Sequence, residues 1–296
     1  CSRDATTRIL ESWVSRRSNA RCLVLTQNAG KAQGLDRALS ASPGSELVAV
    51  YDADLRPLPN SLRILAGAFG DERIGAVAGF RRPSNTAASP VAAYGALESL
   101  VHQLTTQAGK ERLGLNPTTM GGNCVYRRSA LQQIGGFPAG AFSEDIEISL
   151  ALVAAGWRTK FCRDAVAESS VVESLRRYWN QRCRWTRGLY RSRRRASRLE
   201  SWLVSAGYAD RLVFLATLVL AADGQISVLW PALYCVVLVA SAASALYRAG
   251  LGPGVTARVL LSSPPMFAVD VAVTVVATVN ALLGRRQQWH TGGTSK

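Results

Sequence analysis

Two aspartates stand two residues apart, directly after a short apolar segment. Asp52 and Asp54 follow residues 47–51, which have the length and composition of a buried strand. Where the backbone turns at the end of a strand, such side chains fan around one point, and their hard carboxylate oxygens suit magnesium or manganese. A metal there would bridge a diphosphate and neutralise a leaving group. The alternative is a pair of loop carboxylates that cap the following segment.

An acidic pair opens a second segment of interest. Glu144 and Asp145 stand at the start of a helix predicted over residues 145–155. The helix dipole favours acids at this position, so simple capping is one interpretation. The other interpretation makes Asp145 the general base that takes a proton from an acceptor hydroxyl. Glu147 belongs to the same turn, and we expect it to be solvated.

An amide, an arginine and an indole follow one another closely in a third segment. Gln181 precedes Arg184 by three residues, so both lie on one face of a predicted helix. Arg184 can pair with phosphate oxygens, and Trp185 can stack on a sugar or a base. Arginine and tryptophan are also ordinary in an amphipathic helix at a membrane surface, which is the alternative.

Some single residues carry weaker signals. Lys31 stands between a predicted strand and helix, next to Gly30, where it can reach a phosphate, although a plain turn fits equally well. Asp270 interrupts an apolar segment and is a functional candidate for that reason. His102 and His290 have no evident partner, which favours core or surface roles over catalysis.

The elements that must position these residues alternate along the chain. We predict strands over residues 21–26, 47–51 and 74–80, and helices over residues 30–39, 58–69, 91–108 and 145–155. Alternation of this kind indicates an α/β domain with a Rossmann-like, mostly parallel sheet. Ligands bind at the carboxyl ends of the strands in such sheets, and this is where Asp52 and Asp54 stand.

Charge and hydropathy change sharply after this domain. The net charge is +15, and arginines crowd at positions 187, 191, 193, 194, 195 and 198. Residues 226–247 carry no charge and are long enough to span a bilayer, as are residues 266–284. Residues 212–222 form a third span or an interfacial segment; buried core helices are the alternative. Arg285 and Arg286 make the second flank basic as well, so both flanks are expected to be cytoplasmic.

These features place the chain at a membrane. We interpret the arginine cluster as a collar against membrane lipids rather than a nucleic-acid patch. Six cysteines show neither CxxC nor metal-ligand spacing, which predicts reduced thiols in a cytoplasmic domain. The expected protein is an integral membrane protein of the cytoplasmic (inner or plasma) membrane, with its catalytic domain on the cytoplasmic side.

The order of these motifs resembles one family over roughly residues 21–190. The matching stretches are NAGKAQGLDRAL, VYDADLRP, GGNCVYRRSAL with IGGF, SEDIEISLALVAAGW and YWNQRCRWTRG, and WHT after the last apolar segment. They resemble the membrane-bound family 2 glycosyltransferases of the processive type: cellulose, chitin, hyaluronan and poly-N-acetylglucosamine synthases and nodulation-factor chitooligosaccharide synthases.

The resemblance implies a glycosyltransferase-A fold and an inverting, metal-dependent hexosyltransferase. It would move a sugar from a UDP-sugar, with UDP-N-acetylglucosamine weakly preferred, to the hydroxyl of a growing β-linked polysaccharide. By position, Asp145 with Glu144 would be catalytic, Asp54 with Asp52 would hold magnesium or manganese, and Asp52 with Lys31 would bind the donor. The diphosphate and acceptor would contact Gln181, Arg184, Trp185, Gly122 and Asn123.

The first residues resemble the end of a family segment of the type DDGSxDxT, which adds Asp4 to the donor-binding set. On this basis we expect the first strand to precede Cys1. We divide the chain into a catalytic domain (1–185), a basic interfacial region (186–211) and a transmembrane region with a short basic tail (212–296). Alternatives are single-sugar transfer to a membrane lipid and a non-catalytic membrane scaffold subunit. An accessory export subunit is an expected partner of a polymer synthase.

Overall fold

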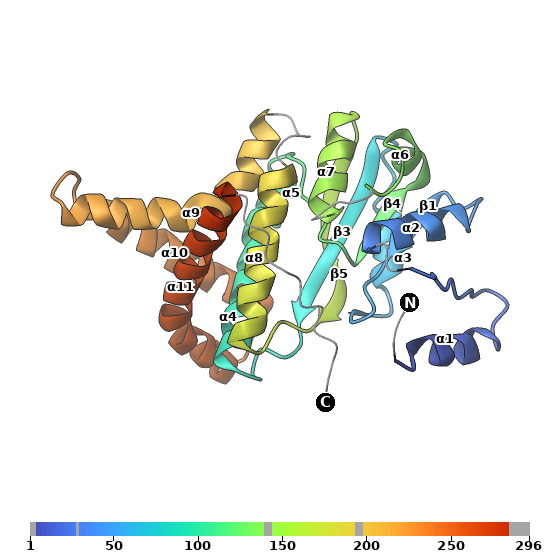
Figure 1. Ribbon diagram of the computed structural model, residues 1–296, viewed down its shortest axis with the longest axis horizontal. Coiled ribbons are helices and arrows are strands. Elements are labelled where there is room, and N and C mark those ends of the chain that lie inside the picture. The colour runs from blue at the N-terminus through green and yellow to red at the C-terminus, as the bar shows by residue number, and fades with distance from the viewer. Residues whose placement is uncertain (1–3, 28–29, 139–143, 193–197, 284–296) are drawn as a thin grey trace.

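The structure is a computed structural model that describes residues 4–27, 30–138, 144–192 and 198–283. Its centre is a five-stranded sheet in the order β1-β4-β3-β5-β2 (Figure 1). The strands are β1 (Leu47–Val50), β2 (Arg56–Pro57), β3 (Ile74–Pro83), β4 (Cys124–Arg127) and β5 (Arg158–Ser169). Strands β1 and β3 match the predictions over residues 47–51 and 74–80.

The sheet is mixed, so the prediction of a mostly parallel sheet is only partly right. Strand β3 runs parallel to β5, but β4 is antiparallel to both β1 and β3, and β2 is antiparallel to β5. Because β4 lies between β1 and β3, those two strands share a direction without pairing. The carboxyl ends of β1, β3 and β5 and the amino end of β4 therefore meet at one edge, with Val50 opposite Cys124.

Alternating side chains bury both faces of the sheet. Ala76, Ala78 and Phe80 of β3 belong to one apolar cluster, and Val77 belongs to another. This alternation follows from the two-residue repeat of a strand. The second cluster packs under α3 (Ser61–Gly67), and the first includes side chains of α2 (Lys31–Ser40), α4 (Pro90–Val101), α6 (Arg128–Gln133) and α7 (Glu144–Ala154). The helix expected over residues 91–108 continues from α4 into a π-helix, His102–Gln107, and then into α5, Ala108–Arg112.

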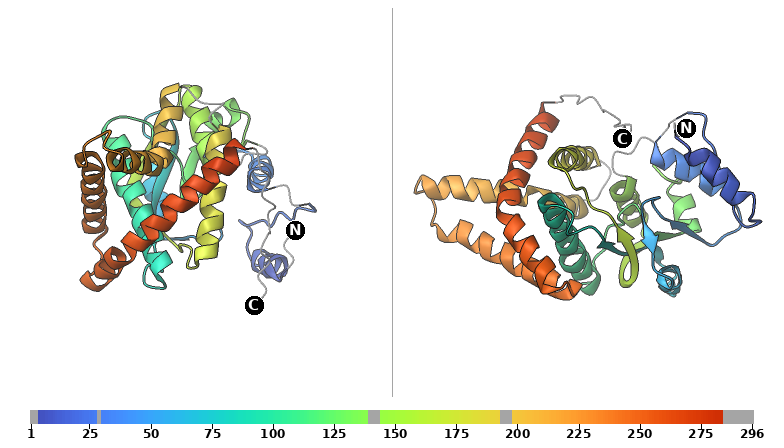
Figure 2. Two further views of the ribbon diagram at one scale, coloured as in Figure 1. Left: turned by 60° about the vertical axis from the view of Figure 1, so that its left-hand side comes forward. Right: turned by 90° about the horizontal axis from the view of Figure 1, so that it is seen from below.

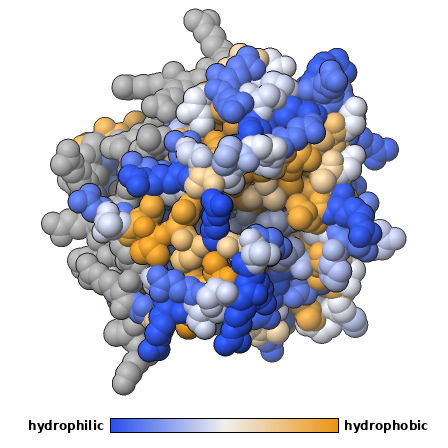
Figure 3. All heavy atoms as spheres, turned by 90° about the vertical axis from the view of Figure 1, so that its right-hand side faces the viewer, coloured by the Kyte–Doolittle hydropathy of each residue, from blue (hydrophilic) through white to orange (hydrophobic). Residues whose placement is uncertain are grey.

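One predicted strand is absent from the described residues, and three observed strands, β2, β4 and β5, were not predicted. Residues 21–26 form no strand, and the side chains of Leu23 and Val24 are 48% and 52% exposed. No described strand lies beside this segment to form backbone hydrogen bonds with it, and its apolar side chains remain at the surface. They belong to the same side of the molecule as α1 (Thr6–Val14), which buries none of its residues. Figure 3 shows apolar patches among hydrophilic side chains on this face.

The C-terminal half packs helices beside α4 and α8 (Leu175–Ser192), on the side away from the sheet (Figures 1 and 2). Two of them, α10 (Leu229–Ala249) and α11 (Pro253–Leu282), are long and apolar enough to cross a membrane. Only 17% and 28% of the most apolar 18-residue segment of α10 and α11, respectively, is buried, whereas the core helices of a soluble protein are mostly buried. They contain most of the two predicted spans, although α11 begins earlier. Residues 212–222 form the end of α9 (Arg198–Ala222).

Candidate active site

A lysine joins three segments at the edge of the sheet where β1 ends. The Nζ of Lys31, the first residue of α2, lies 2.5 Å from Asp52 Oδ1 and 3.0 Å from Glu144 Oε1. It also donates a hydrogen bond of 2.6 Å to the carbonyl oxygen of Gly121. Burial alone would lower the pKa of Lys31, but Asp52 and Glu144 together outweigh it and raise that pKa. An ammonium group has three donors, so these partners use all of them.

Two glycines allow the loop before β4 to approach the carboxylates. Gly121 has a φ of +74°, which favours glycine, and a Cβ there would lie 3.4 Å from Asp145 Oδ2 and from Lys31 Nζ. A Cβ on Gly122 would lie 2.6 Å from Asp52 Oδ2, closer than real Cβ contacts occur. The loop therefore brings bare backbone against Asp52, and it places the first motif beside the second.

Asp145 is held by its own helix start. Its Oδ1 accepts a 2.9 Å hydrogen bond from the Ile146 N–H, while its carbonyl oxygen accepts from the hydroxyls of Thr119 and Ser149 at 3.1 and 2.6 Å. Burial, and next the charge of Glu144, raise the pKa of Asp145 from 3.8 to about 6. A carboxylate with this pKa is a stronger base than an ordinary aspartate, yet it remains ionised at neutral pH.

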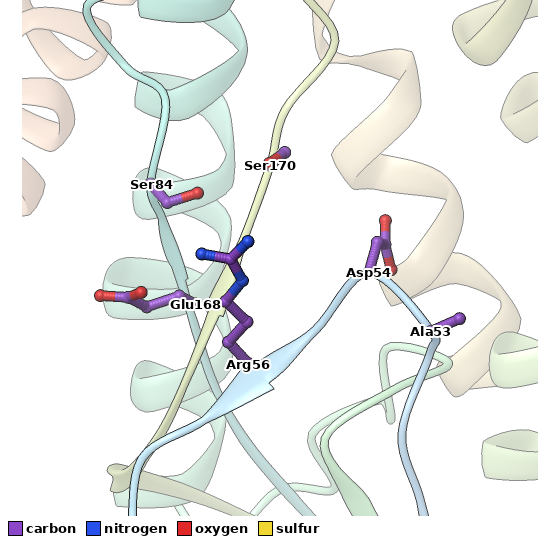
Figure 4. A pocket seen from close by; sticks show the side chains of 6 residues that line it. All are labelled: Ala53, Asp54, Arg56, Ser84, Glu168 and Ser170. Atoms are coloured by element: carbon purple, nitrogen blue, oxygen red, sulfur yellow. The ribbon is translucent and has the colours of Figure 1, made fainter. Parts of the chain in front are cut away.

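Asp54 faces a separate opening at the same edge. It lines a cavity of about 300 Å³ with Ala53, Arg56, Ser84, Glu168 and Ser170, shown in Figure 4. Among the described residues, no hydrogen bond or ion pair reaches the Asp54 carboxylate. The described residues also contain no group of three or more acidic, histidine or cysteine side chains that would hold a metal by themselves. A cation at Asp54 would need oxygens from a bound ligand to complete its coordination.

Asn123 lies at the amino end of β4 with its side chain turned into the sheet. Its Nδ2 donates to the carbonyl oxygens of Phe80 and Ala165 at 3.2 and 2.9 Å, and its Oδ1 accepts from Ser61 at 3.3 Å. The residue is fully buried and has a φ of +53°. Asn123 thus fixes the glycine loop to β3, β5 and α3 at once.

The third motif lies on α8. Gln181 and Trp185 are half-buried and Arg184 is exposed. Helix α8 packs against α11 and also contacts α4 and α7. The Arg182 guanidinium lies over the ring of Trp185, 5.0 Å from its centre. The motif is therefore next to the helix that Asp145 begins, but no described contact joins it directly to Asp52 or Lys31.

The match to a known family agrees with this geometry. The description "Glycosyl transferase family group 2" fits residues 47–248, more than half of the chain. The chain belongs to this glycosyltransferase family. It is 31% identical over 160 residues to a probable glycosyltransferase, YdaM, of Bacillus subtilis (strain 168), and 28% identical over 199 residues to an N-acetylglucosaminyltransferase of Rhizobium meliloti (strain 1021). Those alignments cover 54% and 64% of the chain, but only 38% and 46% of the two relatives.

A solved structure of another protein has a fold similar to that of this glycosyltransferase. The mannosyltransferase PcManGT from Pyrobaculum calidifontis, in complex with GDP-Man and Mn²⁺, is 20% identical with a TM-score of 0.57. The similarity covers 97% of the chain and 76% of PcManGT. At this identity the comparison speaks for the fold alone, which is glycosyltransferase-A-like with a mixed sheet.

Some expected residues of the glycosyltransferase lie elsewhere. Asp4 accepts a 3.1 Å hydrogen bond from the Thr6 N–H at the start of α1, away from the sheet. Glu147 is buried, so the expectation that it is solvated is wrong, because this side of α7 packs inward. His102 is exposed, and its Nε2 lies 2.9 Å from Gln107 Nε2. The positions 143 and 289–291 lie outside the described residues, as do arginines 193–195.

Sequence reasoning missed two groups of residues at this site. Thr119 and Ser149 hold the backbone of Asp145, and their 30-residue separation hid the pairing. Arg182 stands inside the third motif, but its place in a buried cluster depends on α4, α9 and α11. Spacing along one segment contains no signal for such a cluster.

Proposed function

We propose that this protein is an inverting hexosyltransferase that moves a sugar from a UDP-sugar to the hydroxyl of a growing β-linked polysaccharide. The observation that supports the proposal is the meeting of Asp52, Lys31, the glycine loop, Glu144 and Asp145 at one edge of a glycosyltransferase sheet. Donor-binding and base chemistry need this proximity, because the acceptor must attack while the diphosphate leaves.

In the proposed reaction, Asp145 removes the proton of the acceptor hydroxyl. The acceptor oxygen forms a bond to the anomeric carbon as the bond from that carbon to the diphosphate oxygen breaks. UDP leaves with the bonding electron pair, and the configuration at the anomeric carbon inverts. The pKa of about 6 supports this role, because Asp145 is ionised at neutral pH and still basic enough to take a proton in the transition state.

A divalent cation, magnesium or manganese, fits the residues present. Asp54 offers a carboxylate without a described partner, facing an open cavity, and Asp52 stands two residues earlier. Asp52 is neutralised by Lys31, which makes Asp54 the principal protein ligand. When bound, the cation would supply charge stabilisation for the departing diphosphate. Lys31 would release one of its three partners if it also bound a phosphate oxygen.

The remaining roles complete the proposal. Gln181, Arg184 and Trp185 would hold the diphosphate and the acceptor end, on the helix that contacts α7. Gly122 would face the acceptor with its backbone, whereas Asn123 would act by fixing the glycine loop, since its amide is committed to the sheet. Asp4 would assist donor binding only if α1 lay nearer the sheet. N-acetylglucosaminyltransferases among the relatives support UDP-N-acetylglucosamine as the donor.

The cellular setting is also proposed. Helices α10 and α11 would anchor the protein in the cytoplasmic membrane, with the catalytic domain on the cytoplasmic side. The arginine-rich segment before them would contact anionic lipids. Lipids, the glycan and an accessory export subunit are the proposed partners.

The experiment is incubation of the full-length protein in membranes with a panel of UDP-sugars, with and without Mn²⁺. UDP release and product mass are measured together. We expect metal-dependent UDP release and a ladder of glycan masses with one sugar. A product of one sugar on a lipid would replace the polymer proposal, and no release with any UDP-sugar would contradict the proposed function.

A further inference from the structure

A cluster of four charged side chains is buried where α4, α8, α9 and α11 meet. Arg211 Nη2 lies 3.0 Å from Glu98 Oε1, and Arg211 Nε lies 2.7 Å from Asp270 Oδ2. Arg182 pairs with Glu98, and its Nε lies 3.7 Å from Asp270 Oδ1. The Tyr178 hydroxyl lies 2.9 Å from Glu98 and 2.6 Å from Asp270. The two carboxylates thus each contact both guanidiniums.

Asp270 lies in the middle of the stripe of α11 that faces α8. Met266 packs with Tyr178 on one side of it, and Val273 and Ala277 pack with Cys183 on the other. The spacing of four, three and four residues keeps these positions on one helical face. The Asp270 side chain is only 3% exposed. A candidate membrane helix is therefore joined to α8 by an apolar seam with a charged centre.

The cluster reaches the third motif through Arg182. Its guanidinium lies between two rings, 4.9 Å from the centre of Tyr178 and 5.0 Å from the centre of Trp185. A planar guanidinium stacks on aromatic faces in a way that an ammonium group does not. Moving Arg182 would therefore move or release the indole of Trp185.

Stability alone does not explain such a cluster. Burying ions costs desolvation free energy, and well-packed apolar residues of similar size are often as stabilising. What charged pairs provide is a fixed geometry, because two fork-shaped donors and two carboxylates fit in few arrangements.

We propose that Asp270 is a positioning residue: through Arg182 it sets the place of Trp185 and so couples the membrane helix α11 to transfer of sugar to the acceptor. This inference rests on the proposed function for its catalytic consequence, but its structural part stands separately. The cluster contacts neither Asp52 nor Lys31, so the donor contacts of these two residues are independent of it, and within the third motif we assign Trp185 to the acceptor end.

The test compares full-length Asp270→Asn with wild type in membranes. Asparagine keeps the size of the side chain and an oxygen for Tyr178, but removes the charge that lies 2.7 Å from Arg211 and 3.7 Å from Arg182, leaving Glu98 to pair with both guanidiniums. We expect the transfer rate at saturating donor to fall about 10- to 100-fold, with the donor KM within about twofold, because misplacement of a positioning group lowers the rate of attack. The melting temperature should fall, because two buried guanidiniums then share one carboxylate, so transfer is compared per amount of folded protein at a temperature well below the transition. Asp223→Asn, in the turn after α9, is the matched control and should behave as wild type.

A second variant and a second measurement keep the result decisive. Arg182→Lys keeps the charge but loses the flat stacking group, so we expect the same loss of transfer. This variant serves as the test if Asp270→Asn does not accumulate. Hydrogen exchange should quicken in residues 178–186 of Asp270→Asn, but not in residues 144–154. Hydrogen exchange tests the positioning claim even if the wild-type protein transfers no sugar. Absence of wild-type transfer would contradict only the proposed function. Wild-type transfer in both variants, unchanged exchange in α8, or a loss explained wholly by less folded protein would overturn the proposal.

Discussion

We expect one carboxylate, Asp145, to set the acid limb of the pH–rate profile. Burial and the charge of Glu144 raise the pKa of Asp145 from 3.8 to about 6. A general base works only when ionised, so activity is present above this pKa and is lost as the pH falls through it. The ionised share is about nine-tenths at pH 7, roughly half at pH 6 and about a tenth at pH 5.

We therefore expect kcat/KM for transfer to fall about tenfold between pH 7 and pH 5, since kcat/KM reports the ionisation of the free enzyme. The assay is UDP release coupled to product formation by the full-length protein in membranes, with the acceptor held below its KM so that the enzyme is free of acceptor. With an ordinary pKa of 3.8, activity at pH 5 would stay within about 10% of its value at pH 7. The two outcomes differ enough to be separated by initial rates.

Two variants check the cause of this shift. Glu144→Gln removes a charge that raises the pKa of Asp145, so the acid limb should move partway to lower pH while the part due to burial remains. Asp71→Asn is the control, because Asp71 is a half-buried partner of Arg73 away from the site, and its substitution should leave the profile unchanged. A wild-type profile that stays flat to pH 5 would refute the assignment of Asp145 as a general base with a raised pKa.

Three substitutions and one ion removal test the rest of the site. Gly122→Ala places a Cβ 2.6 Å from Asp52 Oδ2, so we expect a loss of transfer and of about 1–3 kcal/mol of stability by thermal unfolding. Lys31→Gln leaves two carboxylates without their cation, so the donor KM should rise about 10- to 100-fold in steady-state kinetics. Asn123→Asp removes the amide donor to two carbonyl oxygens and should cost about 1–3 kcal/mol of stability in the same unfolding assay. Chelation should abolish transfer, and Mn²⁺ or Mg²⁺ should restore it, as measured by UDP release.

Each of these results has a control or a contrary outcome. Gly67→Ala matches Gly122→Ala, since nothing lies within 4 Å of its Cβ, and both activity and stability should be retained. A wild-type donor KM in Lys31→Gln would show that the lysine does not organise the donor site. An unchanged melting temperature in Asn123→Asp would contradict its fixing of the loop. Full activity in chelator would exclude a divalent cation at Asp54.

Hydrophobic patterns and helix-start signals within single segments correctly predicted individual strands and helices. The apolar run before Asp52 became β1, and the acidic start at Glu144 became the first turn of α7. Both signals lie within one element, where periodicity and capping act. The membrane candidates α10 and α11 were likewise visible as length and hydropathy.

The sequence did not predict the strands and contacts that depend on segments far apart along the chain. Strand β4 is short and follows two glycines, so its antiparallel insertion between β1 and β3 left no periodic signal. Strand β5 alternates at Thr159, Phe161, Ala165 and Ala167, but an irregular stretch at 162–164 breaks the pattern. The engagement of Lys31 with three partners and the cluster around Asp270 depend on contacts across many elements, which no single segment encodes.

The central claim is that Asp145 is the base of a sugar-transfer site built at this edge of the sheet. The most direct measurement is the rate of transfer by full-length Asp145→Asn in membranes, with the melting temperature recorded beside it. We expect a loss of transfer of at least about 100-fold, within the range for a general base. The melting temperature at pH 8 should be equal or higher, because the substitution removes a desolvated charge that disfavours the folded state above the pKa. Transfer near the wild-type rate by folded Asp145→Asn would contradict the account.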